Sequence, residues 1–285
     1  MATAAEKQGF RPVHEAHAIE QLVATVQFEQ PLADDAIRAA MDVMSRFNDV
    51  LPGRNEIRGM GFQIGPQGVT PIASRISGVP DGIVRTFSDG RGVVVKELRL
   101  DRQSLVFRTL TYTRWDAVWG EARRYFEVLL PIFGGINIAA YALSYVDKFI
   151  WTGSLEKCRP IALLKPSSPY ISPASFEATD LWHCHFGRFV AAGEQTKRLE
   201  VVDFDCIDEA DALGATQEAV RVVRISTTVT DFFNQPGFSA YLLPADESMP
   251  QLDRAFSALH SLLKDVFGAI VGDEAAIQVG LNNAG

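Results

Sequence analysis

The sequence predicts an α+β protein made of two halves, each an antiparallel β-meander followed by one long amphipathic helix. Several segments alternate apolar and polar residues with the period of two that is typical of strands. Residues 113–130 and 248–270 instead repeat apolar residues at helical spacing. Turns rich in Gly, Asp and Pro separate the strands, which favours antiparallel connections. No matching residues indicate that one half duplicates the other.

The N-terminal half is expected to span residues 19–157, after a flexible arm over residues 1–18. Alternation in Ile19–Phe28 predicts a strand. A helix is expected from Asp34, because acidic residues suit the positive end of a helix dipole. Its buried stripe is predicted to consist of Ile37, Met41, Met44 and Phe47.

Residues 50–82 are rich in Gly and Pro and predict short strands near residues 61–64 and 69–76. Ser88-Asp89-Gly90 predicts a hairpin, because Asp-Gly readily adopts positive φ. Asp101-Arg102-Gln103 predicts a second tight connection. Residues 83–112 are therefore expected to form a three-stranded meander.

The next helix is expected to begin at Thr113, whose hydroxyl can cap the free amide groups, with Asp116 completing an arrangement close to a capping box. Pro131 and Gly134-Gly135 end this helix, and Ile136–Trp151 returns as a long strand. The predicted buried face is broad and aromatic, and consists of Trp115, Val118, Trp119, Ala122, Tyr125, Phe126 and Leu129.

Residues 158–175 contain four prolines and predict a linker between the halves. The C-terminal half is expected over residues 176–275, with three long strands and a helix from Ser248 that opens with capping-box spacing to Gln251. Residues 276–285 are expected to form a tail.

Composition excludes some classes of function. The chain has 285 residues, a formal net charge of -8 and 47% apolar residues, which is ordinary for a globular protein. The negative charge argues against binding to nucleic-acid backbones, and no apolar run is long enough to span a membrane. Three cysteines without a CxxC pair, and a start without a signal-peptide core, favour the cytoplasm. The Gly-rich segments match no phosphate-binding loop.

Two histidines and two aspartates form the sharpest chemical pattern. His183 and His185 lie two apart on one expected strand, and Asp203 and Asp205 on the next, so a divalent metal site is conceivable. The intervening residues are apolar and face the core, which favours a solvated polar face without a cofactor. A cross-strand His–Asp pair without metal is a third interpretation.

Aromatic and charged residues supply a second candidate site. Tyr112 and Trp115 could stack on a ligand, although their strand-end and helical spacing favours core packing. Tyr145, Asp147 and Lys148 place polar groups in an apolar strand, as an outward-facing pair or as a polar element at the seam between the halves. We take these five residues as the candidate binding or interaction residues.

The segment Leu98–Trp115 contains the pattern L-x-x-D-R-x-S-L-x-F-x-x-x-x-Y-x-x-W. With this pattern the chain resembles a sporadically distributed, functionally uncharacterised family of bacterial proteins, over about residues 19 to 275. The family's long strand ends in an Arg-Tyr-x-Asn-Arg-like segment, whereas residues 143–148 here read LSYVDK. The resemblance implies a bacterial cytoplasmic protein, associated with defence or toxin-neutralising gene cassettes, with no known cofactor.

The leading functional hypothesis is a non-catalytic protein that binds another protein or its own copy. A metal-assisted hydrolase using His183, His185, Asp203 and Asp205 is one alternative. A small-ligand carrier is the other, and it requires a cavity between sheet and helix.

Overall fold

One antiparallel sheet of eleven strands carries both halves of the chain. The structure is a computed structural model that describes residues 8–58, 61–65, 68–72, 78–210, 219–233 and 243–281. The predicted α+β class is confirmed, with an antiparallel meander and one long helix in each half. Whether the halves share a sheet was open from the sequence, and they do.

The long strand β9 (Asn137–Thr152) joins the halves, because it pairs with β2 of the first half and β12 of the second. Along the sheet the order is β10 (Trp182–Ala191), β11 (Lys197–Ala210), β12 (Ala219–Phe232), β9, β2 (Ile19–Phe28), β8 (Ser104–Thr109), β7 (Val94–Asp101), β6 (Gly82–Ser88) and β3 (Gly53–Ile57). The short strands β1 (Gly9–Pro12) and β13 (Leu243–Pro244) pair with the ends of β9. A separate two-stranded sheet consists of β4 (Gly61–Gly65) and β5 (Gly68–Ile72).

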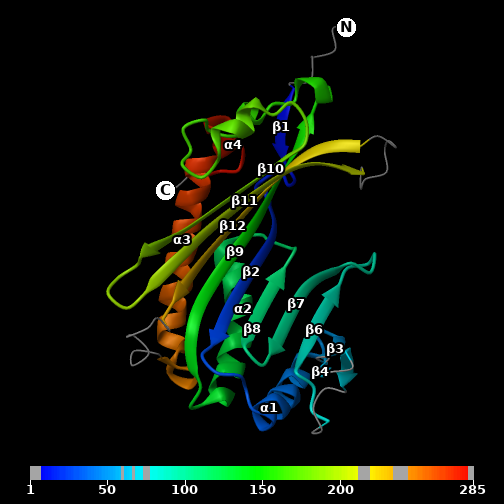
Figure 1. The fold of residues 1–285 in the computed structure, drawn as a ribbon, viewed down its shortest axis with the longest axis vertical. Helices are drawn as coiled ribbons and strands as arrows, with labels where there is room; N and C mark the ends of the chain where they lie inside the picture. Colours follow the sequence, from blue (N-terminus) through cyan, green and yellow to red (C-terminus); the bar gives the residue numbers. More distant parts are fainter. Residues whose placement is uncertain are drawn as a thin grey trace.

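The helices α2 (Trp115–Leu129) and α3 (Met249–Ile270) cover one face of the sheet, behind the strands in Figure 1. α1 (Asp34–Met44) lies at one end of the molecule, and α4 (Asp273–Gln278) at the other. No helix in the described ranges has both the length and the apolarity needed to cross a membrane. Short 3₁₀ turns are η1 (Ser45–Phe47), η2 (Leu130–Phe133), η3 (Leu155–Lys157), η4 (Pro160–Ala162), η5 (Pro173–Glu177) and η7 (Ala245–Glu247).

Two apolar cores lie under the helices. The first surrounds α2, where Trp119 stacks on Phe256 of α3 at a centroid distance of 4.5 Å. The second lies under the C-terminal part of α3, where Phe149 of β9 stacks on Phe267. α3 is long enough to cover both cores, and the functional site described below lies where they meet.

Both predicted helix caps are wrong in detail. α2 begins at Trp115, and its cap position is Arg114, which makes no side-chain cap. Thr113 lies one residue too early, since the chain is still extended at Arg114. Ser248 does occupy the cap position of α3, but its hydroxyl donates backwards to the Ala245 carbonyl. Packing of the apolar stripes, not side-chain capping, therefore determines where these helices begin.

Segments expected to be loose take part in the fold. Within the predicted arm, residues 9–12 form β1, while residues 1–7 lie outside the described ranges. The Pro-rich segment 158–175 packs on the second core through Leu163, Leu164 and other buried residues. The residues predicted as tail begin inside α4.

The turn at Asp101-Arg102 ties the first half together. The Asp101 carboxylate accepts hydrogen bonds from the amides of Gln103 and Ser104. The Arg102 guanidinium is 8% exposed, donates to the Leu32 carbonyl and forms ion pairs with Asp34 and Asp81. This pair of residues holds the start of α1 against the meander.

Candidate functional site

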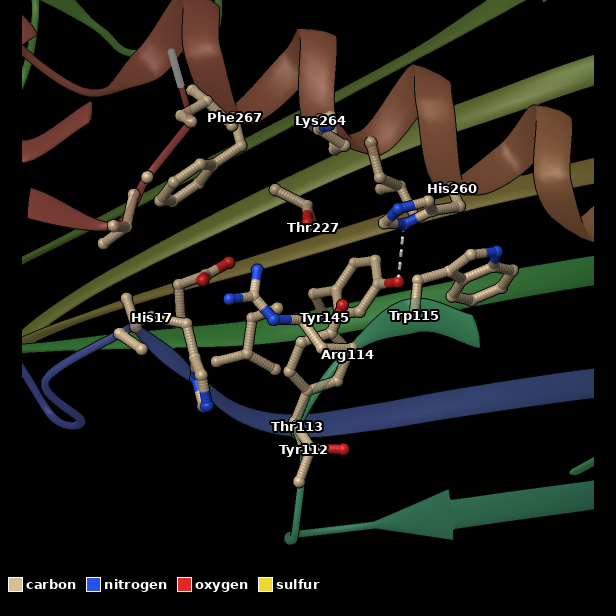
Figure 2. Close-up of a pocket in the computed structure, with 18 of the residues that line it drawn as sticks. His17, Tyr112, Thr113, Arg114, Trp115, Tyr145, Thr227, His260, Lys264 and Phe267 are labelled. Carbon is tan, nitrogen blue, oxygen red and sulfur yellow. Dashed lines mark hydrogen bonds between the residues drawn. The ribbon is translucent and has the colours of Figure 1, made fainter. Parts of the chain in front are cut away.

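A cavity of about 550 Å³ lies between the sheet and α3, at the junction of the two cores. Its floor comes from β9 and β12, and its walls from residues 16–19, the entry to α2 and residues 279–281. In Figure 2, Phe267, Lys264 and His260 of α3 lie opposite Tyr145, Thr113 and Tyr112. A volume of this size suits a small organic molecule.

Asp147 is the unusual residue of the floor. Successive residues of a strand face opposite sides, so Tyr145, Asp147 and Phe149 share the covered face of β9. The Asp147 carboxylate is 5% exposed and has no ion-pair or hydrogen-bond partner within the described part of the chain. Burial raises its pKa to about 8, because the ionised form has lost its hydration. A buried carboxylate without a partner is costly, which marks this position as a candidate site.

Tyr145 and His260 connect the floor to the helix. The Tyr145 hydroxyl lies 2.9 Å from His260 Nδ1, and the His260 ring stacks on Trp115 with centroids 4.3 Å apart. Burial, aided by the charge of Lys264, lowers the pKa of His260 to about 4. Depending on its tautomer, the neutral ring accepts a hydrogen bond from the Tyr145 hydroxyl at Nδ1 or donates one to it. The stack of His260 on Trp115 closes one end of the cavity.

Tyr112 completes an aromatic wall beside the carboxylate. Its ring meets that of Tyr145 edge-on at 5.9 Å. Burial and the charge of Asp147 raise the pKa of Tyr112 to about 12, and the same causes raise the pKa of Tyr145. Asp147 therefore lies close enough to both phenol groups to act on them electrostatically.

His17 enters the cavity from an irregularity at the start of β2. The register between β2 and β9 shifts between Ile19 and Gln21, beside Asp147. Such bulges redirect the chain next to functional sites. His17 Nδ1 is buried without a hydrogen-bond partner in the described ranges, and burial lowers the pKa of the ring. The cavity thus contains a second buried polar atom without a partner in the described ranges, although the His17 ring also interacts with the backbone of Tyr112 and Ile19.

The mouth of the cavity carries exposed charges of both signs. Arg114 and Asp116 stand at the entry to α2, and Lys264 stands on α3. These side chains reach solvent, but the charge of Arg114 still acts on the cavity, because it contributes to lowering the pKa of His17 and opposes the rise in the pKa of Tyr112.

The lining mixes polar groups with aromatic side chains. It combines aromatic rings, the buried hydroxyl of Thr227 and a buried carboxylate. No serine or cysteine belongs to the described lining, and no described group of three or more His, Cys, Asp or Glu residues could hold a metal ion. The lining is about as polar as it is apolar, and a cavity that combines aromatic side chains with convergent polar groups is a common form of small-molecule site.

Four of the five residues proposed from the sequence as a binding site meet here: Tyr112, Trp115, Tyr145 and Asp147. Lys148 does not, because it points to the opposite face of the sheet. There it forms ion pairs with Glu20 at 3.3 Å and Glu209 at 2.7 Å. Asp147 is thus a polar element at the seam between the cores, and the interpretation of Asp147 and Lys148 as an outward-facing pair is wrong.

The histidines and aspartates of the possible metal site lie elsewhere, on the solvent-facing side of strands β10 and β11. His183 Nδ1 is 2.7 Å from Asp205 Oδ1, and His185 Nδ1 is 2.5 Å from Asp203 Oδ1. These are two cross-strand pairs, with each histidine bonded to the residue directly opposite.

Sequence reasoning missed His260, His17 and Thr227 as lining residues. His260 follows Leu259 of the buried stripe of α3. A histidine beside a buried stripe could have been taken from the sequence as a candidate lining residue. His17 and Thr227 offered no signal, because their positions depend on which strands are neighbours. Thr227 lies opposite Tyr145 in the pairing of β12 with β9.

No protein-family model matches this chain, and no curated protein matches it significantly. The site therefore has to be interpreted from its own geometry.

Proposed function

We propose that this protein is a non-catalytic binding protein that takes a small organic molecule into the cavity between β9 and α3. The observation that carries this proposal is the buried, unpartnered Asp147 in an aromatic-walled cavity of about 550 Å³. A fold gains nothing from such a carboxylate, since burial without a partner destabilises it. A ligand that satisfies Asp147 and His17 Nδ1 would account for both.

This proposal adopts the small-ligand alternative over a protein partner or a second copy of the chain. A protein surface would not use polar groups at the floor of a cavity. The metal-assisted hydrolase receives less support, because each of its histidines is already hydrogen-bonded to one aspartate in an exposed cross-strand pair. Exposed pairs of this kind contribute little and are common on sheet faces.

The family likeness supports the same site indirectly. Its pattern includes Tyr112 and Trp115, which line the cavity, beside Asp101 and Arg102, which hold the fold. We propose that the chain belongs to that bacterial family, works in the cytoplasm, and that the cavity is the family's functional feature. A place in a defence or toxin-neutralising cassette is part of this proposal.

The test is a search for bound molecules. Protein purified under native conditions is denatured, and the released small molecules are identified by mass spectrometry; a fragment library is then titrated by calorimetry. Ala16→Trp places an indole at the exposed mouth and is expected to abolish binding. Ala117→Trp is the matched control, because Ala117 is exposed on α2 outside the cavity lining. Equal binding by both variants, or no released molecule and no fragment hit, contradicts the proposal.

A further inference from the structure

We infer that the ligand is a small organic ammonium compound whose single positive charge lies against the Asp147 carboxylate. This inference rests on the proposed function and names the chemical class that the cavity selects. It follows from the charge at the floor, the aromatic groups beside it and the charges at the mouth.

The floor suits a cation. Asp147 lies among Tyr145, Phe149 and the apolar side of α3, with no basic partner in the described ranges. An ammonium group would ionise this carboxylate and form a desolvated, charge-assisted hydrogen bond with it. An anionic ligand would be repelled by the ionised carboxylate. A neutral ligand could form a hydrogen bond with Asp147 but would gain no attraction between opposite charges.

The walls suit the same chemistry. The rings of Tyr112 and Tyr145 stand beside Asp147, and Trp115 and Phe267 line the cavity further out. Aromatic faces attract ammonium groups through their quadrupoles, most strongly where water is excluded. The remaining volume then holds an apolar body attached to the ammonium group.

The mouth limits the number of charges. Arg114 and Lys264 are basic and stand where the outer end of a ligand would lie. A second ammonium group at that end would be repelled, so polyamines are disfavoured. A single cation with an apolar, polar or anionic outer end fits.

Four probes of similar type separate these possibilities by isothermal titration calorimetry at pH 7.5. They are benzylamine as the monocation, benzyl alcohol as its neutral counterpart, benzoate as the anion and spermidine as the polycation. We expect benzylamine to bind at least tenfold more tightly than the other three. Asp147→Asn, which keeps the shape of the side chain, is expected to weaken benzylamine binding at least tenfold and leave benzyl alcohol unchanged.

Asp116→Asn is the control, because it removes a carboxylate from the exposed mouth; we expect less than a threefold effect on benzylamine. Equal affinity for benzylamine and benzyl alcohol, or an unchanged affinity in Asp147→Asn, overturns the inference. Preferential binding of benzoate or of spermidine also overturns it, as does a neutral or anionic co-purifying molecule; the proposed function stands in these cases. If no probe binds and no molecule co-purifies, both fail.

Discussion

The Tyr145 hydroxyl and His260 Nδ1 lie 2.9 Å apart, although 115 residues separate them in the chain. Tyr145 belongs to the central strand β9 and His260 to α3, so this hydrogen bond fixes the height of the helix above the sheet at the cavity. It also links two groups whose pKa values burial moves in opposite directions, upward for the tyrosine and downward for the histidine.

Tyr145→Phe is expected to lower the free energy of unfolding by about 1 kcal/mol, because it leaves the half-buried histidine nitrogen without its partner. Urea unfolding of Tyr145→Phe, His260→Phe and the double variant measures the coupling between them. We expect a coupling of about 0.5–1.5 kcal/mol. Additive effects of the two changes would show that the hydrogen bond does not stabilise the fold.

Asp147→Asn is expected to stabilise the ligand-free protein at high pH. The unfolded carboxyl ionises near pH 4, whereas the folded one holds its proton to about 8. The folded state therefore binds more protons in this range, and stability falls as the pH rises from about 4 to 8. Other charged or titratable groups around the cavity are His17, Tyr112, Arg114, Asp116, Tyr145, His260 and Lys264.

Thermal unfolding at pH 4.5 and 8.5 measures this effect. The free energy of unfolding of Asp147→Asn should equal that of the parent at pH 4.5 and should be larger by a few kcal/mol at pH 8.5. A difference of this order follows from the pKa shift of Asp147, because each pKa unit corresponds to about 1.4 kcal/mol. Asp265→Asn, on the exposed side of α3, is the control; because it keeps Asp147, it should show the same pH dependence as the parent. A variant that is less stable than the parent at both pH values contradicts the account of Asp147.

His260 produces the opposite slope at lower pH. Its folded pKa of about 4 lies below the usual 6.5, so the unfolded state takes up the proton first. The contribution of the neutral His260 ring to stability is therefore complete above pH 6.5 and is lost as the pH falls towards 4. Between pH 7 and pH 4.5, His260→Gln should lose about 1–3 kcal/mol less free energy of unfolding than the parent. His17, whose pKa is also lowered, accounts for part of the loss that remains in the variant.

The control for His260 is His183→Gln, because His183 lies on an exposed strand and its ring bonds only Asp205. Chemical unfolding at the two pH values should leave its slope equal to that of the parent. An unchanged slope in His260→Gln would mean that the buried ring does not stay neutral in the folded state.

Arg102→Ala is expected to destabilise the fold by about 3–5 kcal/mol, because it leaves Asp34 and Asp81 without their shared buried cation. Arg102→Lys should recover only part of the loss, since an ammonium group cannot reproduce the fork of hydrogen bonds. Arg99→Ala removes an exposed ion pair with Asp101 and should cost less than about 1 kcal/mol in the same urea titration. Similar losses for Arg99→Ala and Arg102→Ala would refute this role of Arg102.

His183→Ala tests the rival metal site by elemental analysis. Because each histidine bonds a single aspartate on an exposed face, we expect no stoichiometric zinc, manganese or iron in the parent and a stability change below about 0.5 kcal/mol. Stoichiometric metal that disappears in the variant would restore the hydrolase hypothesis.

The sequence could predict what depends on local pattern. The pattern of apolar residues predicted the long strand that contains Tyr145 and Asp147, and the helical stripe identified the buried face of α3. It could not show that β9 would lie between β2 and β12, because the pairing of distant strands leaves no local trace. The meeting of Asp147 with His17, Thr227 and His260 depends on that pairing, so the cavity had to come from the structure.

The position of β9 between β2 and β12 also bears on how the protein folds. Strand β12 is synthesised after β9 and after the whole Pro-rich segment. One edge of β9 therefore stays unpaired until β12 has been made. Contacts this distant along the chain slow folding, and an open strand edge invites association with other chains in the meantime. A nascent chain that stops before residue 219 therefore lacks the part of the cavity floor that β12 supplies, and one edge of its central strand β9 stays unpaired.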